Sequence, residues 1–443
     1  MKRAFFVIGI SVCILGASLP VKAADILTLE ESIEIALERS LAALSADEEI
    51  RATEYEERSA KADFYPKLST GYSYTRLDDE TVDEANRRLP LGFTATRHDT
   101  YTFNLTATQP VFTGWALTTT RDLASLGVDI AKIQKETTVQ DLVLNVKEAY
   151  FGILKAQKLE TVAKQAVEQL EAQLKVSQAF YDEGIIAKND LLQTEVQMAQ
   201  ARQDLITATN GIALAQSLFN KLLRREINEE VRIKDILDYN PIRLTLAEAL
   251  EEALLKRPEI NEVALNVQSA ERSVDLSKSN YYPTVTLIGN YQRETDDVLL
   301  ESIPGEDPDR WTVTLQGEWT FWEWGKTRHE VTAARARLQK AKYVLDGVKD
   351  NIKLEVKEAY LSLREAEKNI QVAKTAVVQA EENFRMNEER YKQQVATSTD
   401  VLDAQTLLTQ ARTNYFNALS DHNIAWARLE RAMGMVGYER AKD

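Results

Sequence analysis

Hydrophobic side chains recur at three- and four-residue steps over two very long stretches of this chain. In residues 116–180 and 326–390, leucine, valine, isoleucine and alanine keep this spacing, which places them along one side of an α-helix. No proline falls inside either stretch, so nothing interrupts the helix. About 65 helical residues at 1.5 Å each make a rod of roughly 100 Å. After a short turn, returning helices are predicted over 189–223 and 399–433.

Two shorter helices are predicted ahead of each rod. The first is amphipathic and covers residues 29–39 in one half of the chain and 246–256 in the other. The second ends at two aromatic residues followed by proline, at 64–66 and again at 281–283. Proline just beyond a helix is a stop signal. Both halves therefore begin with the same pair of helices.

Between these helices the pattern changes to strict alternation of apolar and polar residues, which is typical of β-strands. Residues 101–108 alternate Tyr, Phe, Leu and Ala with Thr and Asn, and residues 311–319 alternate Trp, Val, Leu and Gly with Thr, Gln and Glu. A weaker alternation precedes each of them. The predicted strand pairs span 67–109 and 284–321, and a polar, acidic loop joins the two strands of each pair.

The two halves are one unit written twice. Residues 146–150 and 356–360 both read VKEAY, and the same offset of 210 relates Asp190 to Asp400. Nearer the start of each unit the offset is 217, as the aromatic-proline stops show. Internal repeats decide architecture before any single motif does. The predicted repeats are 24–236 and 237–443.

The first 23 residues have the character of a secretory signal peptide. Lys2 and Arg3 precede a short apolar run, and small residues around Ala23 suit signal peptidase. The alternative is a membrane anchor, but the apolar run is too short to span about 30 Å of hydrocarbon. Cys13, the only cysteine, lies inside this segment. We therefore expect an exported chain without disulfides or a lipid anchor on cysteine.

The charge of the exported chain excludes one class of partner. Loss of Lys2, Arg3 and Lys22 with the signal takes the formal net charge from −15 to −18. An acidic chain of this kind is a poor candidate for binding nucleic acid.

Four strands are too few for a closed membrane barrel, because the smallest natural ones have about eight. Open strand edges in lipid would leave backbone groups unpaired at several kcal/mol each. The strands are nevertheless apolar on one side and Thr-rich on the other, as lipid beside a water-filled lumen requires. Three chains would supply twelve strands and six similar units, which predicts a homotrimer. The alternative is a small soluble sheet with one face on a core.

Aromatic residues favour the membrane interpretation. They gather at the helix-side ends of the predicted strands, and Trp and Tyr at one level mark a membrane–water interface. The expected belt comprises Phe64, Tyr65, Phe112, Trp115, Tyr281, Tyr282, Trp319, Phe321, Trp322 and Trp324.

The chain resembles the TolC family of outer-membrane efflux proteins over nearly all of its mature length. The resemblance rests on the duplicated order of elements and on three motifs: QPVFTG at 109–114, YDEG at 181–184 and DVLDA at 400–404. It implies a twelve-stranded trimeric barrel in the outer membrane of a Gram-negative bacterium, continued by an α-helical tunnel through the periplasm. It also implies a periplasmic adaptor and an inner-membrane pump of the RND or ABC type as partners. The class is α plus membrane β.

The resemblance implies a pore constriction at Asp400 and Asp403, which share a helix face because they are three residues apart. The first unit has Asp190 but Gln193 instead of the second acid. The alternative is that these acids cap the returning helix. Family members often place a basic residue just before the acids, whereas residues 393–398 carry no charge.

The resemblance also implies that the two helical turns dock an adaptor. Their small and apolar residues suit contact with helical hairpins, although an ordinary turn with Gly184 at a helix C-cap is the alternative. The residues concerned are Gly184, Ile185, Ile186, Ala187, Val395, Ala396, Thr397 and Ser398.

Enzyme chemistry finds little support. His98, His329 and His422 lack metal-ligand spacing, and no glycine-rich phosphate loop is present. We therefore expect no catalytic residues, no metal and no cofactor. A periplasmic coiled-coil scaffold or adaptor with a small soluble sheet stays open as the main alternative. A secreted hydrolase would need a catalytic cluster that the sequence does not contain.

Overall fold

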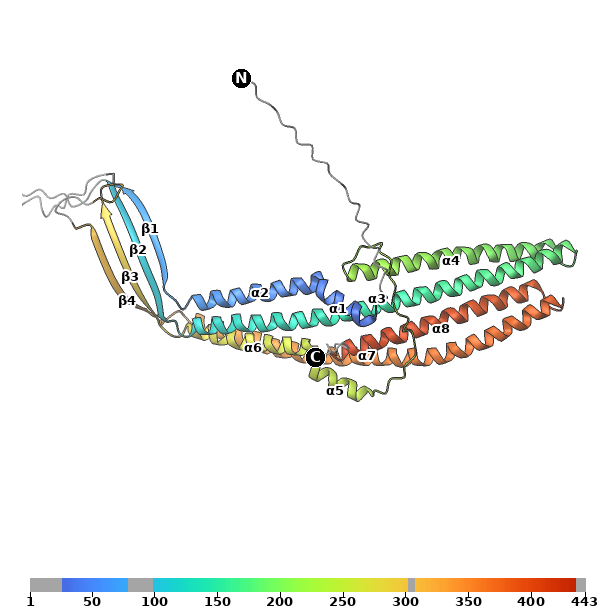
Figure 1. Cartoon of the computed structure of the whole chain (residues 1–443). Helices are drawn as coiled ribbons and strands as arrows, with labels where there is room; N and C mark the ends of the chain where they lie inside the picture. The colour runs from blue at the N-terminus through green and yellow to red at the C-terminus, as the bar shows by residue number, and fades with distance from the viewer. Residues whose placement is uncertain (1–25, 79–98, 302–306, 436–443) are drawn as a thin grey trace, which may run out of the picture.

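The computed structural model describes residues 26–78, 99–301 and 307–435. The expected signal peptide with Cys13, most of the first acidic loop, and His98 lie outside these residues. Within them the molecule is elongated, with a sheet at one end and two helical turns at the other (Figure 1).

Two helices of 67 residues form the length of the molecule: α3 (Ala116–Asp182) and α7 (Lys326–Lys392). Each extends two residues beyond its expected end. The returning helices α4 (Lys188–Leu222) and α8 (Ser398–Ala432) pack against α3 and α7 respectively, and α8 also packs on α3. The two antiparallel pairs lie side by side in Figure 1.

The shorter helices are α1 (Leu29–Arg39), α2 (Leu41–Ala62), α5 (Leu246–Lys256) and α6 (Pro258–Ser279). A reciprocal capping box starts α1 through Thr28 and Glu31, and Thr245 and Glu248 repeat it at α5. Such a box satisfies two helix N–H groups that would otherwise lack partners. Beyond α1 and α5, α2 packs along α3, and α6 packs along both α3 and α7.

The strands β1 (Lys67–Arg76), β2 (Asp99–Phe112), β3 (Thr284–Thr295) and β4 (Asp309–Glu318) form one antiparallel sheet in that order. β2 runs past the expected residue 109 because a bulge between Pro110 and Phe112 accommodates the proline. β4 ends three residues before the expected 321. Its last residue, Glu318, pairs with Thr284, and Pro283 before Thr284 cannot donate to a longer ladder.

The register gives the sheet two different faces, as the alternation predicts. Leu105 lies opposite Tyr291, and Leu287 lies opposite Leu315, so aliphatic and aromatic side chains share one face. The other face is rich in threonine, and Thr106 donates a 2.9 Å hydrogen bond to Asn290 there. The outer edges of β1 and β4 have no strand partner in the described part of the chain.

The main core lies at mid-molecule, where α1, α5 and the linker between the repeats cover the long helices. Tyr150 of α3 is fully buried, and its hydroxyl donates to the carbonyl oxygens of Leu27 and Lys234 at 3.2 and 2.7 Å. Its counterpart Tyr360 reaches Leu244 in the second repeat. Within the described residues, no helix is apolar enough over a sufficient length to cross a membrane.

Candidate functional site

The two helical turns lie at the end of the molecule farthest from the sheet (Figure 1). α3 ends with Glu183 as its C-cap, and Gly184 follows in the left-handed region at φ 72°. The N–H of Ile185 donates to Phe180 at 2.8 Å, which closes a Schellman-type turn. Gly184 therefore lies one position beyond the expected cap. Gln394 takes the same place after α7 at φ 61°, where a side chain is less favourable than glycine.

Most of the expected docking residues are accessible at these turns. Ile185 and Val395 are 45% and 61% exposed, while Ile186 and Ala396 are half-buried. Ser398 differs because it is buried and its Oγ lies 3.1 Å from Oγ of Thr194. That contact joins α4 to α8, so the Ser398 side chain is not available to a partner.

Asp400 caps the helix on which it lies. Its Oδ2 accepts hydrogen bonds from the backbone N–H and the hydroxyl of Thr397, at 2.8 and 2.7 Å. The N–H of Asp400 donates back to the Thr397 hydroxyl at 3.2 Å. These bonds, with the charge of Arg390 as a smaller cause, lower the pKa of Asp400. The capping alternative therefore holds for Asp400, and Arg390 supplies a basic group that lies before residues 393–398.

Asp403 is arranged differently. It is exposed on α8 one turn beyond Asp400. Its counterpart Gln193 accepts a 3.2 Å hydrogen bond from the hydroxyl of Thr399, so in the first repeat this position helps to join α4 to α8. At this position the second repeat therefore presents an exposed carboxylate, whereas the first repeat presents an amide that contacts the other repeat.

Tyr391 makes a contact between the repeats that the sequence analysis did not predict. It is buried at the end of α7, its hydroxyl lies 3.1 Å from Ser177 Oγ, and its ring packs on Phe180. The equivalent Tyr181 is only partly buried. Tyr391 therefore ties the tip of the second repeat to α3 of the first.

At the opposite end, aromatic side chains collect where strands meet helices. Trp115 packs edge-on against Phe112 and Tyr282, with ring centroids 5.2 and 4.9 Å apart. In the second repeat Trp319 contacts Phe321, and its Nε1 donates to the Tyr281 carbonyl oxygen at 3.2 Å. The other pair, Trp322 and Trp324, is largely exposed. Phe64 and Tyr65 are also exposed, where α2 leads into β1.

The turn from β2 into α3 permits only a small residue. Gly114 has φ 60°, and a Cβ there would lie 2.5 Å from the Ser279 carbonyl oxygen. This close approach brings the β2 end against the α6 end, and it explains the glycine in the QPVFTG motif.

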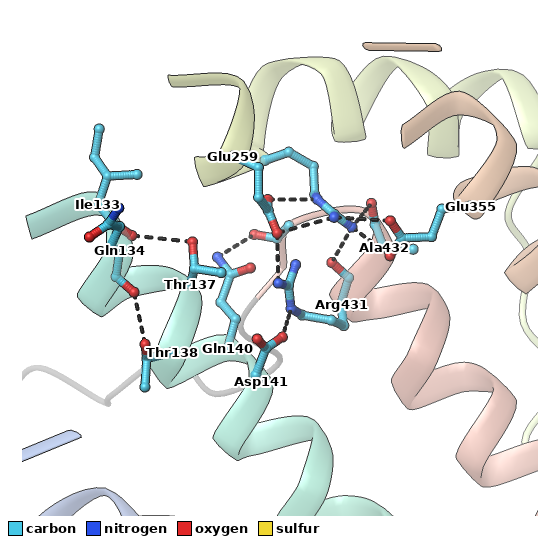
Figure 2. A network of polar contacts seen from close by, with 12 residues as sticks. Ile133, Gln134, Thr137, Thr138, Gln140, Asp141, Glu259, Glu355, Arg431 and Ala432 are labelled. Carbon is cyan, nitrogen blue, oxygen red and sulfur yellow. Dashed lines mark hydrogen bonds and ion pairs between the residues drawn. The ribbon is translucent and has the colours of Figure 1, made fainter. Parts of the chain in front are cut away.

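A partly buried ionic network, centred on two buried arginines, joins four helices at mid-molecule (Figure 2). Arg431 of α8 contacts Asp141 of α3 at 2.6 Å and Glu259 of α6 at 2.7 Å. Arg257, which is 5% exposed, contacts Glu259 and also Glu355 of α7 at 2.8 Å. Burial would raise the pKa of Glu259, but Arg431 and Arg257 outweigh it and the pKa is lowered. This network escaped the sequence interpretation because its members lie far apart along the chain.

Metal binding has no visible site in the part of the chain that the structure describes. No three histidine, cysteine or acidic side chains there are grouped to hold a metal ion. His422 is buried against Tyr239 with a ring separation of 5.1 Å, and His329 is exposed.

A sheet with one apolar face, carried on paired helical rods, defines a membrane channel of the outer-membrane type. The chain belongs to the outer membrane efflux protein family, whose model matches residues 32–223 and 249–435. This membership confirms the resemblance to the TolC family, the duplicated α plus membrane β class, the outer-membrane location and the absence of an enzymatic role. It excludes both the periplasmic scaffold and the secreted hydrolase.

The relatives are distant but similar over most of their length. Outer membrane protein TolC of Vibrio cholerae is 21% identical over 71% of this chain and 72% of its own. Alkaline protease secretion protein AprF of Pseudomonas aeruginosa is 22% identical over 93% and 85%. The Campylobacter jejuni CmeC outer membrane channel has a TM-score of 0.79 at 15% identity, over 94% of this chain and 87% of that one. These relatives are channels and secretion proteins, so the chain is a channel that works with efflux or secretion partners.

Proposed function

We propose that three copies of this chain close a twelve-stranded barrel in the outer membrane and continue it as a helical exit duct through the periplasm. The observation that carries this proposal is the four-stranded sheet with one apolar face and two unpaired edges. Such edges are costly in lipid, and pairing with further copies removes them. The aromatic belt then lies at the inner interface of the outer membrane, facing lipid headgroups.

The channel is passive, and its partners supply the energy of transport. We assign two partners, a periplasmic adaptor and an inner-membrane pump of the RND or ABC type. The names of the relatives support efflux or type I secretion, because AprF is an alkaline protease secretion protein and CmeC is an outer membrane channel. The adaptor docks on the exposed tip residues Gly184, Ile185, Ala187, Val395 and Thr397, with Ile186 and Ala396 at the rim of the contact.

The narrow mouth lies at the same tips and is lined by Asp403, with Asp400 beside it. Three copies place these carboxylates around one axis, where they raise the local concentration of cations. The exposure of Asp403, together with its absence from the first repeat, supports this assignment.

Two measurements on the purified protein test the proposal. Mass measurement in mild detergent is expected to give three copies, and planar-bilayer recording is expected to give discrete, cation-selective conductance steps. A folded monomer that stays in the soluble periplasmic fraction would overturn it, because its strand edges would then face water.

A further inference from the structure

The sheet has two open edges, β1 and β4, and the internal repeat predicts the register in which they pair with further copies. We infer that β4 of one copy pairs antiparallel with β1 of the next copy in one register, with Gln316 opposite Ser73 of that next copy. This inference rests on the proposed assembly of several copies and specifies which residues meet where the copies join.

The repeat supplies the mapping between strands. β1 and β3 start at Lys67 and Thr284, an offset of 217, while β2 and β4 start at Asp99 and Asp309, an offset of 210. Lys67 pairs with Thr108 in the first hairpin, and adding the two offsets gives Thr284 opposite Glu318. That is the observed register of the second hairpin. The offsets therefore carry strand pairing correctly from one repeat to the other.

The pairing of β2 with β3 joins the last strand of the first repeat to the first strand of the second repeat. A β4–β1 contact between copies joins the last strand of a second repeat to the first strand of a first repeat. It is therefore equivalent to the β2–β3 pairing inside one chain. Adding 210 to Thr106 and subtracting 217 from Asn290 converts this observed pair into Gln316 opposite Ser73. On the apolar face, Leu105 opposite Tyr291 becomes Leu315 opposite Tyr74.

The side chains fit this register. Leu315 against Tyr74 repeats an aliphatic–aromatic pair, and Gly317 leaves room for Tyr72 opposite it. A slip of one residue would pair the polar face of β1, which carries Ser69, Ser73 and Thr75, with the apolar face of β4. The loss of matching faces strongly disfavours that register. Gln316 and Ser73 are both polar and lie on the threonine-rich face, as Thr106 and Asn290 do.

The helices show independently that this junction is uncovered in a single copy. Val162 on α3 is 4% exposed, whereas its counterpart Val372 on α7 is 69% exposed. Leu402 on α8 is 5% exposed because it packs on Leu170 and Met198 of the first repeat. Its counterpart Leu192 on α4 is 45% exposed. The same residue type is thus buried where the two repeats of one chain meet and exposed where the next copy would lie.

Paired cysteines test the register directly. Cys13 is the only native cysteine, so a Cys13→Ala background leaves engineered pairs as the only thiols. Opposed residues in an antiparallel ladder lie within the Cα separation of about 4.4–6.8 Å that a disulfide needs. Gln316→Cys with Ser73→Cys is expected to form covalent dimers and trimers on mild oxidation in the outer membrane. Thr106→Cys with Asn290→Cys should oxidise within one chain and serves as the positive control.

Two matched variants report a register shifted by two residues in either direction: Gln316→Cys with Gly71→Cys, and Gln316→Cys with Thr75→Cys. A Cβ at Gly71 meets nothing within 4 Å, so that substitution is tolerated in the fold. Each is expected to cross-link at least tenfold more slowly than the pair with Ser73. Faster cross-linking in either variant overturns the register.

Native mass in detergent, measured for each paired-cysteine variant, separates the remaining outcomes. If the protein is trimeric but none of the three Gln316→Cys pairs cross-links between copies, the β4–β1 junction is overturned and the proposed function stays in place. Folded monomers overturn both.

Discussion

At the residue scale, two carboxylates on one helix face have different surroundings. Asp400 is held by Thr397 in a capping box that lowers its pKa, so its charge is fixed and partly satisfied. Asp403 is exposed and stands where the other repeat has glutamine. The sequence predicted the pair as a site but could not separate the two roles, because capping depends on one side-chain rotamer.

Replacement of each acid by asparagine is expected to separate the roles. Asp403→Asn should lower the cation-to-anion permeability ratio by roughly twofold, since it removes charge from the mouth. Asp400→Asn should change it less, because asparagine still caps well and Asp400 is already engaged. Asp190→Asn in the first repeat is the matched control, and planar-bilayer reversal potentials are the measurement. Unaltered selectivity in the Asp400 and Asp403 double variant would leave capping as the only role of the pair.

His422 is expected to make stability depend on pH. Its burial lowers its pKa below the ordinary value of about 6.5, and Glu367, paired with Arg364, opposes this only in part. The unfolded chain therefore binds a proton more readily, so stability falls as the pH drops below about 6.5 toward the folded-state pKa. His422→Phe should remove this slope and keep the contact with Tyr239. Thermal unfolding of wild type and His422→Phe at pH 7.5 and 5.5 measures this pH dependence of stability.

His329→Gln is the control for this pH dependence, because His329 is exposed. An equal loss of stability on acidification in wild type and His422→Phe would assign the slope to other groups.

At the scale of elements, periodicity predicted the helices and strands well. α1 and α5 begin and end where the pattern of apolar residues does, since a capping box marks each start. Strand ends were predicted less accurately, because the bulge at Pro110 and the position of Pro283 act through the partner strand. The ionic network around Arg431 could not be predicted from the sequence. It joins single side chains from four helices, and no repeat or spacing connects them.

Arg431→Met is expected to loosen the packing of these helices. It removes one of the two arginine partners of Glu259, leaving Arg257 in place, and it leaves the half-exposed Asp141 unpaired. We expect this to cost about 1–3 kcal/mol. Arg428→Met is the matched control on the same helix, because the pair of Arg428 with Glu148 is largely exposed and contributes at most about 1 kcal/mol. The midpoint of chemical unfolding, followed by helical circular dichroism, should fall clearly more for Arg431→Met. Equal midpoints would show that the network adds little to stability.

At the scale of the whole molecule, the duplicated repeats build one continuous rod with different surfaces at its ends. The sheet end carries apolar and aromatic side chains, and the far end carries small, exposed turn residues about 100 Å of helix away. The two repeats share a backbone but differ in the side chains at their tips and at mid-molecule. This separation predicts that changes at the tips leave the barrel intact.

Gly184→Arg is therefore expected to abolish export while the trimer stays inserted in the membrane and conducts. A Cβ at Gly184 meets nothing within 4 Å, so the arginine projects outward into the space that an adaptor hairpin would occupy. The left-handed φ of 72° adds a strain of about 1 kcal/mol that is separate from docking. Gly184→Asn is the control for that strain, because asparagine tolerates this conformation and stays small. Growth on a toxic substrate, in a strain lacking the native gene, should be lost with arginine and kept with asparagine. Full resistance with arginine would remove this turn from the adaptor interface, whereas loss with both would point to the backbone of the turn.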